Sequence, residues 1–149
     1  MEIVGEYTIP QSQMRTWEAV CDPEIMKACI PGCETLERTS PTEFHLTMTT
    51  KIASLTARFR GRITVADAHA PDTYTIVFEG QGGVAGFVTG LAHIKLEPAG
   101  KDTRLHYDAS AKVGGKLAQV SARMVDSVAQ KLTSDFFSAF SRHLGRERG

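Results

Sequence analysis

The stretch that decides the fold is TRLHYDASAKV (residues 103–113), followed by GG (114–115) and KLAQVSARMVDSVAQKLTSDFFSAFSRHL (116–144). The first part is strand-like. The last part has apolar residues at three- and four-residue spacing, which predicts a helix from about Lys116 to Leu144. Its apolar stripe consists of Leu117, Val120, Met124, Val128, Leu132, Phe136 and Phe140. A helix of this length, roughly 40 Å, is too long for a connector, so another surface must cover the stripe.

The sequence before this helix predicts mostly strands. Residues 2–9 alternate as a half-buried strand does, with Ile3, Tyr7 and Ile9 on one face. Between Cys33 and Val113 a meander of strands is expected, divided by turn signals at residues 40–41, 70–72, 82–83 and 98–102. A curved antiparallel sheet is therefore the expected partner of the apolar stripe.

Two short helices are expected between the first strand and the meander. Gln11-Ser12 opens the first helix, and Asp22-Pro23 caps the second, which runs to Ile30. Pro31-Gly32 ends the second helix. The predicted fold class is α+β with a helix-grip layout: about seven antiparallel strands curve around one long C-terminal helix. A sheet curled in this way encloses a hollow, which is where we look for function.

The bulk composition indicates one globular domain. The chain has 149 residues and is 42% hydrophobic, which suits a single core, and we expect a domain over residues 1–145 with a frayed tail at 146–149. Seventeen basic and seventeen acidic residues cancel, so nucleic acid is not an expected partner.

Nothing in the sequence predicts export or a membrane span. The N-terminus lacks a basic segment followed by an apolar one, and no apolar run reaches the roughly 18 residues of a transmembrane helix. Cys21, Cys29 and Cys33 match no common zinc spacing, so we expect reduced thiols in the cytoplasm and no metal site.

Several short segments carry a resemblance to a known family. They are residues 30–34 (IPGCE), the glycine-rich run 80–90, residues 103–109 (TRLHYDA) and, most specifically, VGGKLA at 113–118. Over nearly the whole chain the sequence resembles the helix-grip fold of START and birch-pollen-allergen-like (Bet v 1-like, SRPBCC) proteins. Within that superfamily it is similar to the family of the carbon monoxide dehydrogenase subunit CoxG.

The resemblance implies a non-enzymatic accessory protein of a molybdenum hydroxylase of the carbon monoxide dehydrogenase type. Members are thought to tie such enzymes to the membrane or its quinone pool, with an apolar hollow suited to a lipid or quinone. Longer members carry a C-terminal extension with an apolar anchor, whereas this sequence ends at Gly149. The expected location is the cytoplasm, with peripheral contact at the inner face of the cell membrane.

The hollow should be lined by the inward phases of the strands and by the helix stripe. The candidates for binding a lipid or quinone are Ile63, Val65, Tyr74, Ile76, Phe78, Tyr107, Leu117, Val120, Met124 and Val128. On the residues alone these stripes fit a filled core as well as a cavity. The family resemblance favours the cavity.

A glycine-rich segment suggests a portal into the hollow. Its candidates are Gly82, Gly83, Gly86 and Phe87. Glycines in or near strands also mark bends and close approaches, so plain sheet curvature explains them as well. No phosphate-binding GxGxxG or GxxxxGK[ST] motif is present.

The sequence predicts no catalytic residue and no cofactor. Glu79, His106 and Asp108 fall on outward strand phases, and no HExxH or GxSxG motif occurs. Two alternatives stay open at this point. One is a helix-grip enzyme of the cyclase or hydrolase type, and the other is an interaction module with a filled core.

Three arginines form a candidate partner-docking row. Arg58, Arg60 and Arg62 alternate along one strand and share its outward face. A solvated sheet face explains such a row, and so does a docking patch for acidic hydroxylase subunits or anionic lipid head groups.

Overall fold

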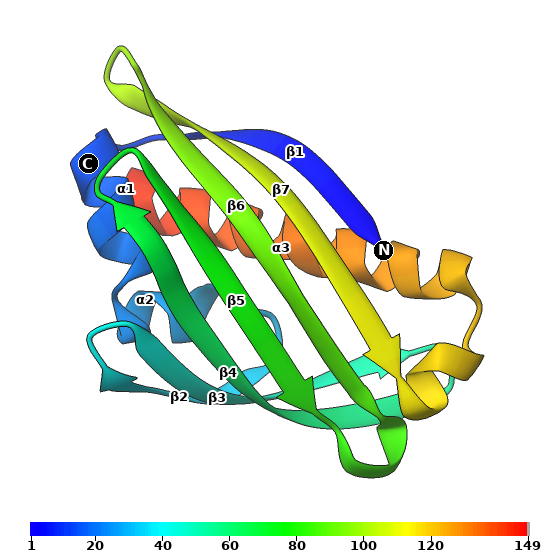
Figure 1. Ribbon diagram of the computed structural model, residues 1–149. Helices are drawn as coiled ribbons and strands as arrows, with labels where there is room; N and C mark the ends of the chain where they lie inside the picture. The colour runs from blue at the N-terminus through cyan, green and yellow to red at the C-terminus, as the bar shows by residue number, and fades with distance from the viewer. Residues whose placement is uncertain (149) are drawn as a thin grey trace.

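One antiparallel sheet curls around a long C-terminal helix in the computed structural model, which describes residues 1–148 (Figure 1). In those residues the sheet has seven strands in the order β1-β7-β6-β5-β4-β3-β2. The strands are β1 (Glu2–Ile9), β2 (Cys33–Ser40), β3 (Glu43–Ile52), β4 (Leu55–His69), β5 (Thr73–Gln81), β6 (Phe87–Ala99) and β7 (Asp102–Gly114). The predicted helix-grip fold is confirmed.

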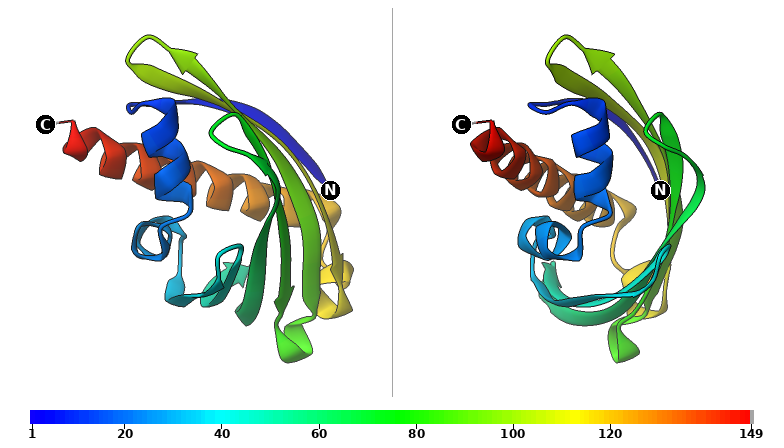
Figure 2. Two further views of the ribbon diagram at one scale, coloured as in Figure 1. Left: turned by 60° about the vertical axis from the view of Figure 1, so that its left-hand side comes forward. Right: turned by 90° about the vertical axis from the view of Figure 1, so that its left-hand side faces the viewer.

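Two short α-helices, two 3₁₀ turns and one long helix complete the described part of the chain. They are α1 (Gln13–Val20), α2 (Pro23–Cys29), η1 (Gly83–Ala85), η2 (Gly115–Gln119) and α3 (Ala122–Glu147). Both views in Figure 2 show the concave side of the sheet turned towards α3, with α1 and α2 beside the helix. The concave side of the sheet and α3 therefore face each other where the sequence predicts a hollow.

Helix caps fix where the helices begin. The Ser12 hydroxyl accepts a hydrogen bond from the Arg15 amide at 3.2 Å, and the Asp22 carboxylate accepts one from the Glu24 amide at 2.9 Å. Pro23 follows Asp22 as the first residue of α2, where its missing amide hydrogen costs nothing. These are the starts that the sequence predicted.

The long helix begins later than predicted. Gly115, at φ +69°, turns the chain into η2, and the Ser121 hydroxyl then accepts a hydrogen bond from the Met124 amide at 3.2 Å. This cap makes Ala122 the first residue of α3, so the predicted start at Lys116 is wrong. The helix continues through Glu147 into the tail expected to fray, and Gly149 lies outside the described residues.

The later start changes which residues face inwards. Val125, Phe137, Phe140 and Leu144 are the buried residues of α3, whereas Met124 is 42% exposed. Met124 was predicted to line the hollow because the spacing from Leu117 and Val120 was extended into the helix, although those two residues precede it. The predicted position of Met124 is therefore wrong.

The apolar core consists of two clusters, one towards each end of the sheet. The larger cluster lies where α1, α2 and the end of α3 meet the sheet, and its fully buried members include Ile9, Leu96, Leu105, Phe140 and Leu144. Burying each such side chain stabilises the fold by about 1.5–3 kcal/mol. The smaller cluster comprises Ile52, Ala57, Phe59, Ala85 and Leu117.

The phase of α3 is testable with neighbouring substitutions. Val125→Ala should lower the free energy of unfolding by about 1.5 kcal/mol, because it removes two buried methyl groups. Met124→Ala should change it by less than about 0.5 kcal/mol, because Met124 is largely solvated. Urea unfolding of both variants measures this, and a larger loss for Met124→Ala would contradict the observed phase.

Candidate ligand-binding cavity

The space between the sheet and α3 is a cavity with two adjoining compartments. The larger has a volume of about 480 Å³ and the smaller about 270 Å³. Residues that line both compartments come from the N-terminus, the end of α2, the strands β3 to β6, and α3: Met1, Ile30, Met48, Ile63, Phe78, Val88, Ala129 and Leu132. Met1, which is 37% exposed, forms part of both linings beside the start of β1.

Most of the residues predicted to line the hollow do so. Side chains of the sheet that line the larger compartment include Ile63, Val65, Tyr74, Ile76, Phe78 and Tyr107. Leu117 and Val128 line the smaller one. Val120 and Met124 belong to neither lining: Val120 packs against the small core cluster, and Met124 lies in the first turn of α3 and is 42% exposed. Whether the lining residues bind a ligand stays a prediction.

Other lining residues were missed in the sequence. They include Ile30, Phe44, Met48, Val88, Ile94, Thr133 and Phe137. Phe44 and Met48 alternate along β3, and Val88 and Ile94 follow the same phase in β6, so strand periodicity could have found them. The missed α3 residues Thr133 and Phe137 directly follow Leu132 and Phe136 of the predicted apolar stripe, which line the same compartment.

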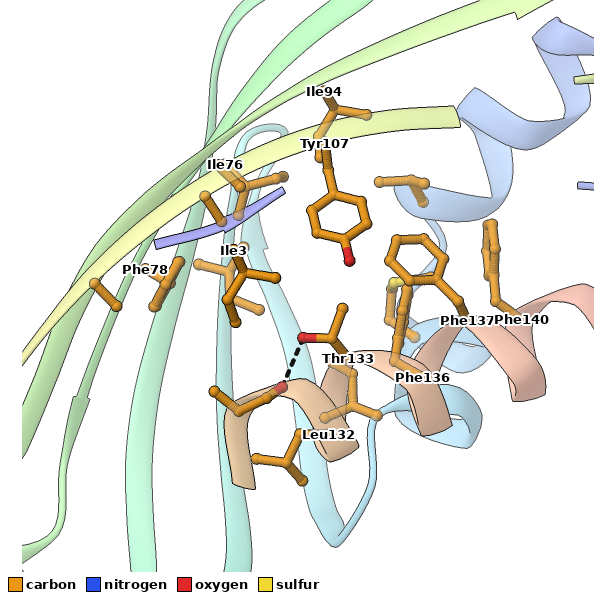
Figure 3. A pocket seen from close by; sticks show the side chains of 18 of the residues that line it. Ile3, Ile76, Phe78, Ile94, Tyr107, Leu132, Thr133, Phe136, Phe137 and Phe140 are labelled. Carbon is orange, nitrogen blue, oxygen red and sulfur yellow. Dashed lines mark hydrogen bonds between the residues drawn. The ribbon is translucent and has the colours of Figure 1, made fainter. Parts of the chain in front are cut away.

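An aromatic stack positions the Tyr107 phenol in the wall of the larger compartment. Phe137 stacks on Tyr7 with ring centroids 4.3 Å apart and on Tyr107 at 5.4 Å. Gly5, opposite Tyr107 in the sheet, leaves room for the phenol, because a Cβ there would collide with the Tyr107 hydroxyl. Figure 3 shows Tyr107 from β7 and Thr133 from α3 projecting into the same space.

These two hydroxyls differ in what they can offer a ligand. The Thr133 hydroxyl donates to the carbonyl oxygen of Ala129 at 2.8 Å, which leaves its oxygen free to accept. Burial raises the pKa of the Tyr107 hydroxyl, and the neighbouring Tyr7 hydroxyl acts in the same direction. Burial also raises the pKa of Tyr74. Both tyrosines therefore stay protonated at neutral pH, and Tyr107 presents a neutral donor in apolar surroundings.

Charged side chains are kept out of the larger compartment. Among the described residues, its lining contains no Asp, Glu, Lys, Arg or His. Arg62 and Glu79 border the smaller compartment, but their side chains pair with each other at 2.6 Å. His106 pairs with Glu6 at 3.2 Å, and the His93 ring lies 3.1 Å from the Thr75 hydroxyl. These contacts occupy titratable groups that a catalytic site would need.

No metal site or membrane span is found in the described part of the chain. Within residues 1–148, no group of three or more His, Cys, Asp or Glu side chains is arranged to hold a metal ion. No helix in that range combines the length and apolar character that crossing a bilayer requires.

Two of the portal candidates, Gly86 and Phe87, pack against the turn before α3. The backbones of Gly86 and Gly115 approach so closely that a Cβ at Gly86 would overlap the Gly114 carbonyl oxygen. A Cβ at Gly114 would likewise overlap the Phe87 ring. None of Gly82, Gly83, Gly86 and Phe87 belongs to the lining of either compartment. The geometry accounts for Gly86 as a close backbone approach, and a portal here stays a prediction.

The arginine row is exposed but partly neutralised. Arg58 pairs with Glu34 at 3.2 Å, and Arg62 pairs with Glu43 at 3.5 Å as well as with Glu79. Arg60 forms no ion pair with any described residue. The row therefore offers less free positive charge than the sequence suggested, and its docking role stays a prediction.

Solved structures place the chain in the START-like class of helix-grip folds. A START superfamily protein from Mycobacterium smegmatis superposes with a TM-score of 0.74 at 16% identity, covering 97% of each chain. An aromatase/cyclase from Streptomyces sp. R1128 gives a TM-score of 0.68 at 11% identity, covering 100% of this chain and 96% of that one. These likenesses establish the fold alone.

A family match is more specific. Residues 5–145 match the family of the carbon monoxide dehydrogenase subunit CoxG, and the chain belongs to that family. A conserved protein from Geobacillus kaustophilus is 31% identical, with a TM-score of 0.90 and coverage of 98% of this chain and 96% of that one. No curated protein sequence matches the chain.

The close backbone approach at Gly86 can be tested against a matched glycine. Gly83 also has a positive φ, +59°, but a Cβ there would meet nothing within 4 Å. Gly86, at φ +111° and ψ −150°, lies in a region that almost only glycine adopts. Gly86→Ala should therefore cost about 1–3 kcal/mol more unfolding free energy than Gly83→Ala. Equal losses in thermal or urea unfolding would contradict the contact.

Proposed function

We propose that this chain is a non-catalytic accessory subunit of a molybdenum hydroxylase of the carbon monoxide dehydrogenase type and binds an apolar molecule, a lipid or quinone, in its cavity. The observation that carries the binding proposal is the larger compartment of about 480 Å³, whose lining has no charged side chain among the described residues. Small-molecule sites usually measure about 300–1,000 Å³ and have mostly apolar walls with a few polar groups. Membership of the CoxG family supports the hydroxylase as the partner.

The arrangement of polar and apolar surface suggests how such a ligand lies. Tyr107 and Thr133 place a donor and an acceptor on opposite walls of the larger compartment (Figure 3). A quinone carbonyl would accept from Tyr107, and its ring would lie among Phe136, Phe137 and Phe78. An isoprenoid or acyl tail would extend past Ala129 into the smaller compartment, whose walls are mainly apolar.

The contents of the cavity support a binding role over an enzymatic one. General acid–base catalysis at neutral pH needs a group that can accept a proton within reach of the substrate. Tyr74 and Tyr107, both with raised pKa values, are the titratable side chains in the lining of the larger compartment among the described residues. The filled-core alternative is disfavoured by the volume of the two compartments.

Quinone titration with a blocking variant tests the proposal. Ala129→Phe puts a ring where the two compartments meet, and it should weaken binding of decylubiquinone more than about tenfold by displacing the ligand. Met124→Phe adds the same group to an exposed position of the same helix and should leave the affinity unchanged. Equal quinone affinity for Ala129→Phe and the parent protein would contradict binding in this cavity.

The contribution of the Tyr107 hydroxyl to quinone binding can be tested separately. Tyr107→Phe removes one neutral hydrogen bond of about 1 kcal/mol and should weaken quinone binding by roughly fivefold while hardly changing affinity for a long-chain alkane. Fluorescence quenching or calorimetry measures both. A similar loss for quinone and alkane would show that the phenol acts through packing and not by recognising an oxygen atom.

A further inference from the structure

The convex face of the sheet carries an uncharged row of side chains across four neighbouring strands. Thr64 of β4 pairs with Val77 of β5, Val77 with Leu91 of β6, and Leu91 with Ser110 of β7. We call these four residues the convex row. Val77 is 43% exposed and Leu91 is 37% exposed, and neither belongs to the cavity lining.

The helices leave the convex row uncovered. Both views in Figure 2 place α1, α2 and α3 on the concave side of the sheet. Covering apolar side chains that face water is favourable. Isolated exposed apolar residues are common on protein surfaces, however, so the identity of a binding partner has to come from the charges beside the row.

Two unpaired opposite charges lie at equal distances from the convex row. On β7, Asp108 comes two residues before Ser110 and Lys112 two residues after it, so all three share the outward phase. Asp108 and Lys112 are exposed, and neither forms an ion pair with a described residue. Arg62 and Glu79, which border the row on β4 and β5, already pair with each other at 2.6 Å.

We propose that two copies of the chain pair face to face through the convex row, about a two-fold axis that lies along it. In a contact of this symmetry, residue i meets residue j of the second copy and j meets i. An axis along the row brings the position two residues before it opposite the position two residues after it, on the same strand of the second copy. Lys112 then meets Asp108 of the second copy, Asp108 meets its Lys112, and Val77 and Leu91 pack on their own counterparts.

The other positions beside the row are compatible with this arrangement. On β6, Thr89 and His93 lie two residues to either side of Leu91, so each meets the other across the axis. On β5, Thr75 meets Glu79 in the same way. These rows therefore bring no like charges together.

Charge complementarity favours a second copy as the occupant of this face. A different protein whose surface carries one predominant charge would match either Lys112 or Asp108 and leave the other without a partner. A second copy matches both charges, and it does so twice because of the symmetry. The cavity lies on the opposite side of the sheet, so the inference does not depend on what the cavity binds.

Sedimentation velocity of the full chain over a range of concentrations tests the proposal. Sheets that meet through two apolar side chains and two charge pairs per copy form a small interface, so we expect a dissociation constant of about 10–100 μM. The parent protein should shift from one chain to two over that range. A parent protein that stays monomeric throughout would overturn the proposal.

Charge reversal on β7 tests the symmetry of the contact. Lys112→Glu places two acidic groups opposite each other, Asp108→Lys places two basic groups opposite each other, and each variant alone should dimerise at least about tenfold more weakly. An equimolar mixture of the two variants restores opposite charges at both contacts and should pair as the parent does. Lys27→Glu, at an exposed position of α2, makes the same charge change away from the row and should stay within about twofold. Single variants that pair as the parent does, or a mixture that stays monomeric, would contradict the two-fold contact.

A matched pair of valine substitutions tests the apolar part of the row. Val77→Thr keeps a β-branched side chain in the strand but makes it polar, and it should weaken dimerisation by roughly fivefold with little change in melting temperature. Val84→Thr makes the same change in η1, away from the row, at a side chain that is 83% exposed, and should leave dimerisation unchanged. Equal effects of the two substitutions on the dissociation constant would overturn the assignment of the convex row as the interface.

Discussion

The structure depends on how α3 is held against the sheet. Its C-terminal half is fixed by aromatic and aliphatic packing, in which Phe140 and Leu144 are fully buried and Phe137 stacks on Tyr7. Arg15 of α1 adds two hydrogen bonds of 2.7 Å to the Glu147 carboxylate at the end of the helix. The N-terminal half lacks comparable packing, and Val125 is its one buried residue in the described chain. The helix therefore spans the sheet without filling its concave side.

This arrangement explains how a small domain keeps an apolar cavity. One cluster of core residues closes the end at α1 and α2, and the cluster around Phe59 and Leu117 closes the other. Between them the sheet curves away from α3, and small residues such as Ala92 and Ala129 leave the volume open. Side chains that line the empty cavity lack dispersion contacts on one side. An apolar ligand that binds there would supply these contacts and would stabilise the folded protein.

Much of the fold and part of the cavity could be predicted from the sequence, because strand alternation reports directly on which side chains face inwards. It placed Ile63, Val65 and Tyr74 correctly in the lining. Helical periodicity was less reliable at the start of α3, since Gly115 and the Ser121 cap interrupt the apparent stripe and leave Met124 in solvent.

What could not be predicted depends on contacts between distant elements. Tyr107 and Thr133 come from β7 and α3, and only the curvature of the sheet brings their hydroxyls to one space. The acidic partners of Arg62 lie on the neighbouring strands β3 and β5, and the partner of Arg58 lies two strands away on β2, so the order of the strands in the sheet determines how much positive charge the arginine row keeps.

The central claim, that the hollow of this fold holds an apolar molecule, is tested most directly by native mass spectrometry of the intact protein, followed by organic extraction of the bound material. The account predicts one additional mass per chain, released on denaturation and identified in the extract as a quinone or lipid. A spectrum that shows only the mass of the chain, both as purified and after incubation with quinone and lipid extract, would contradict it.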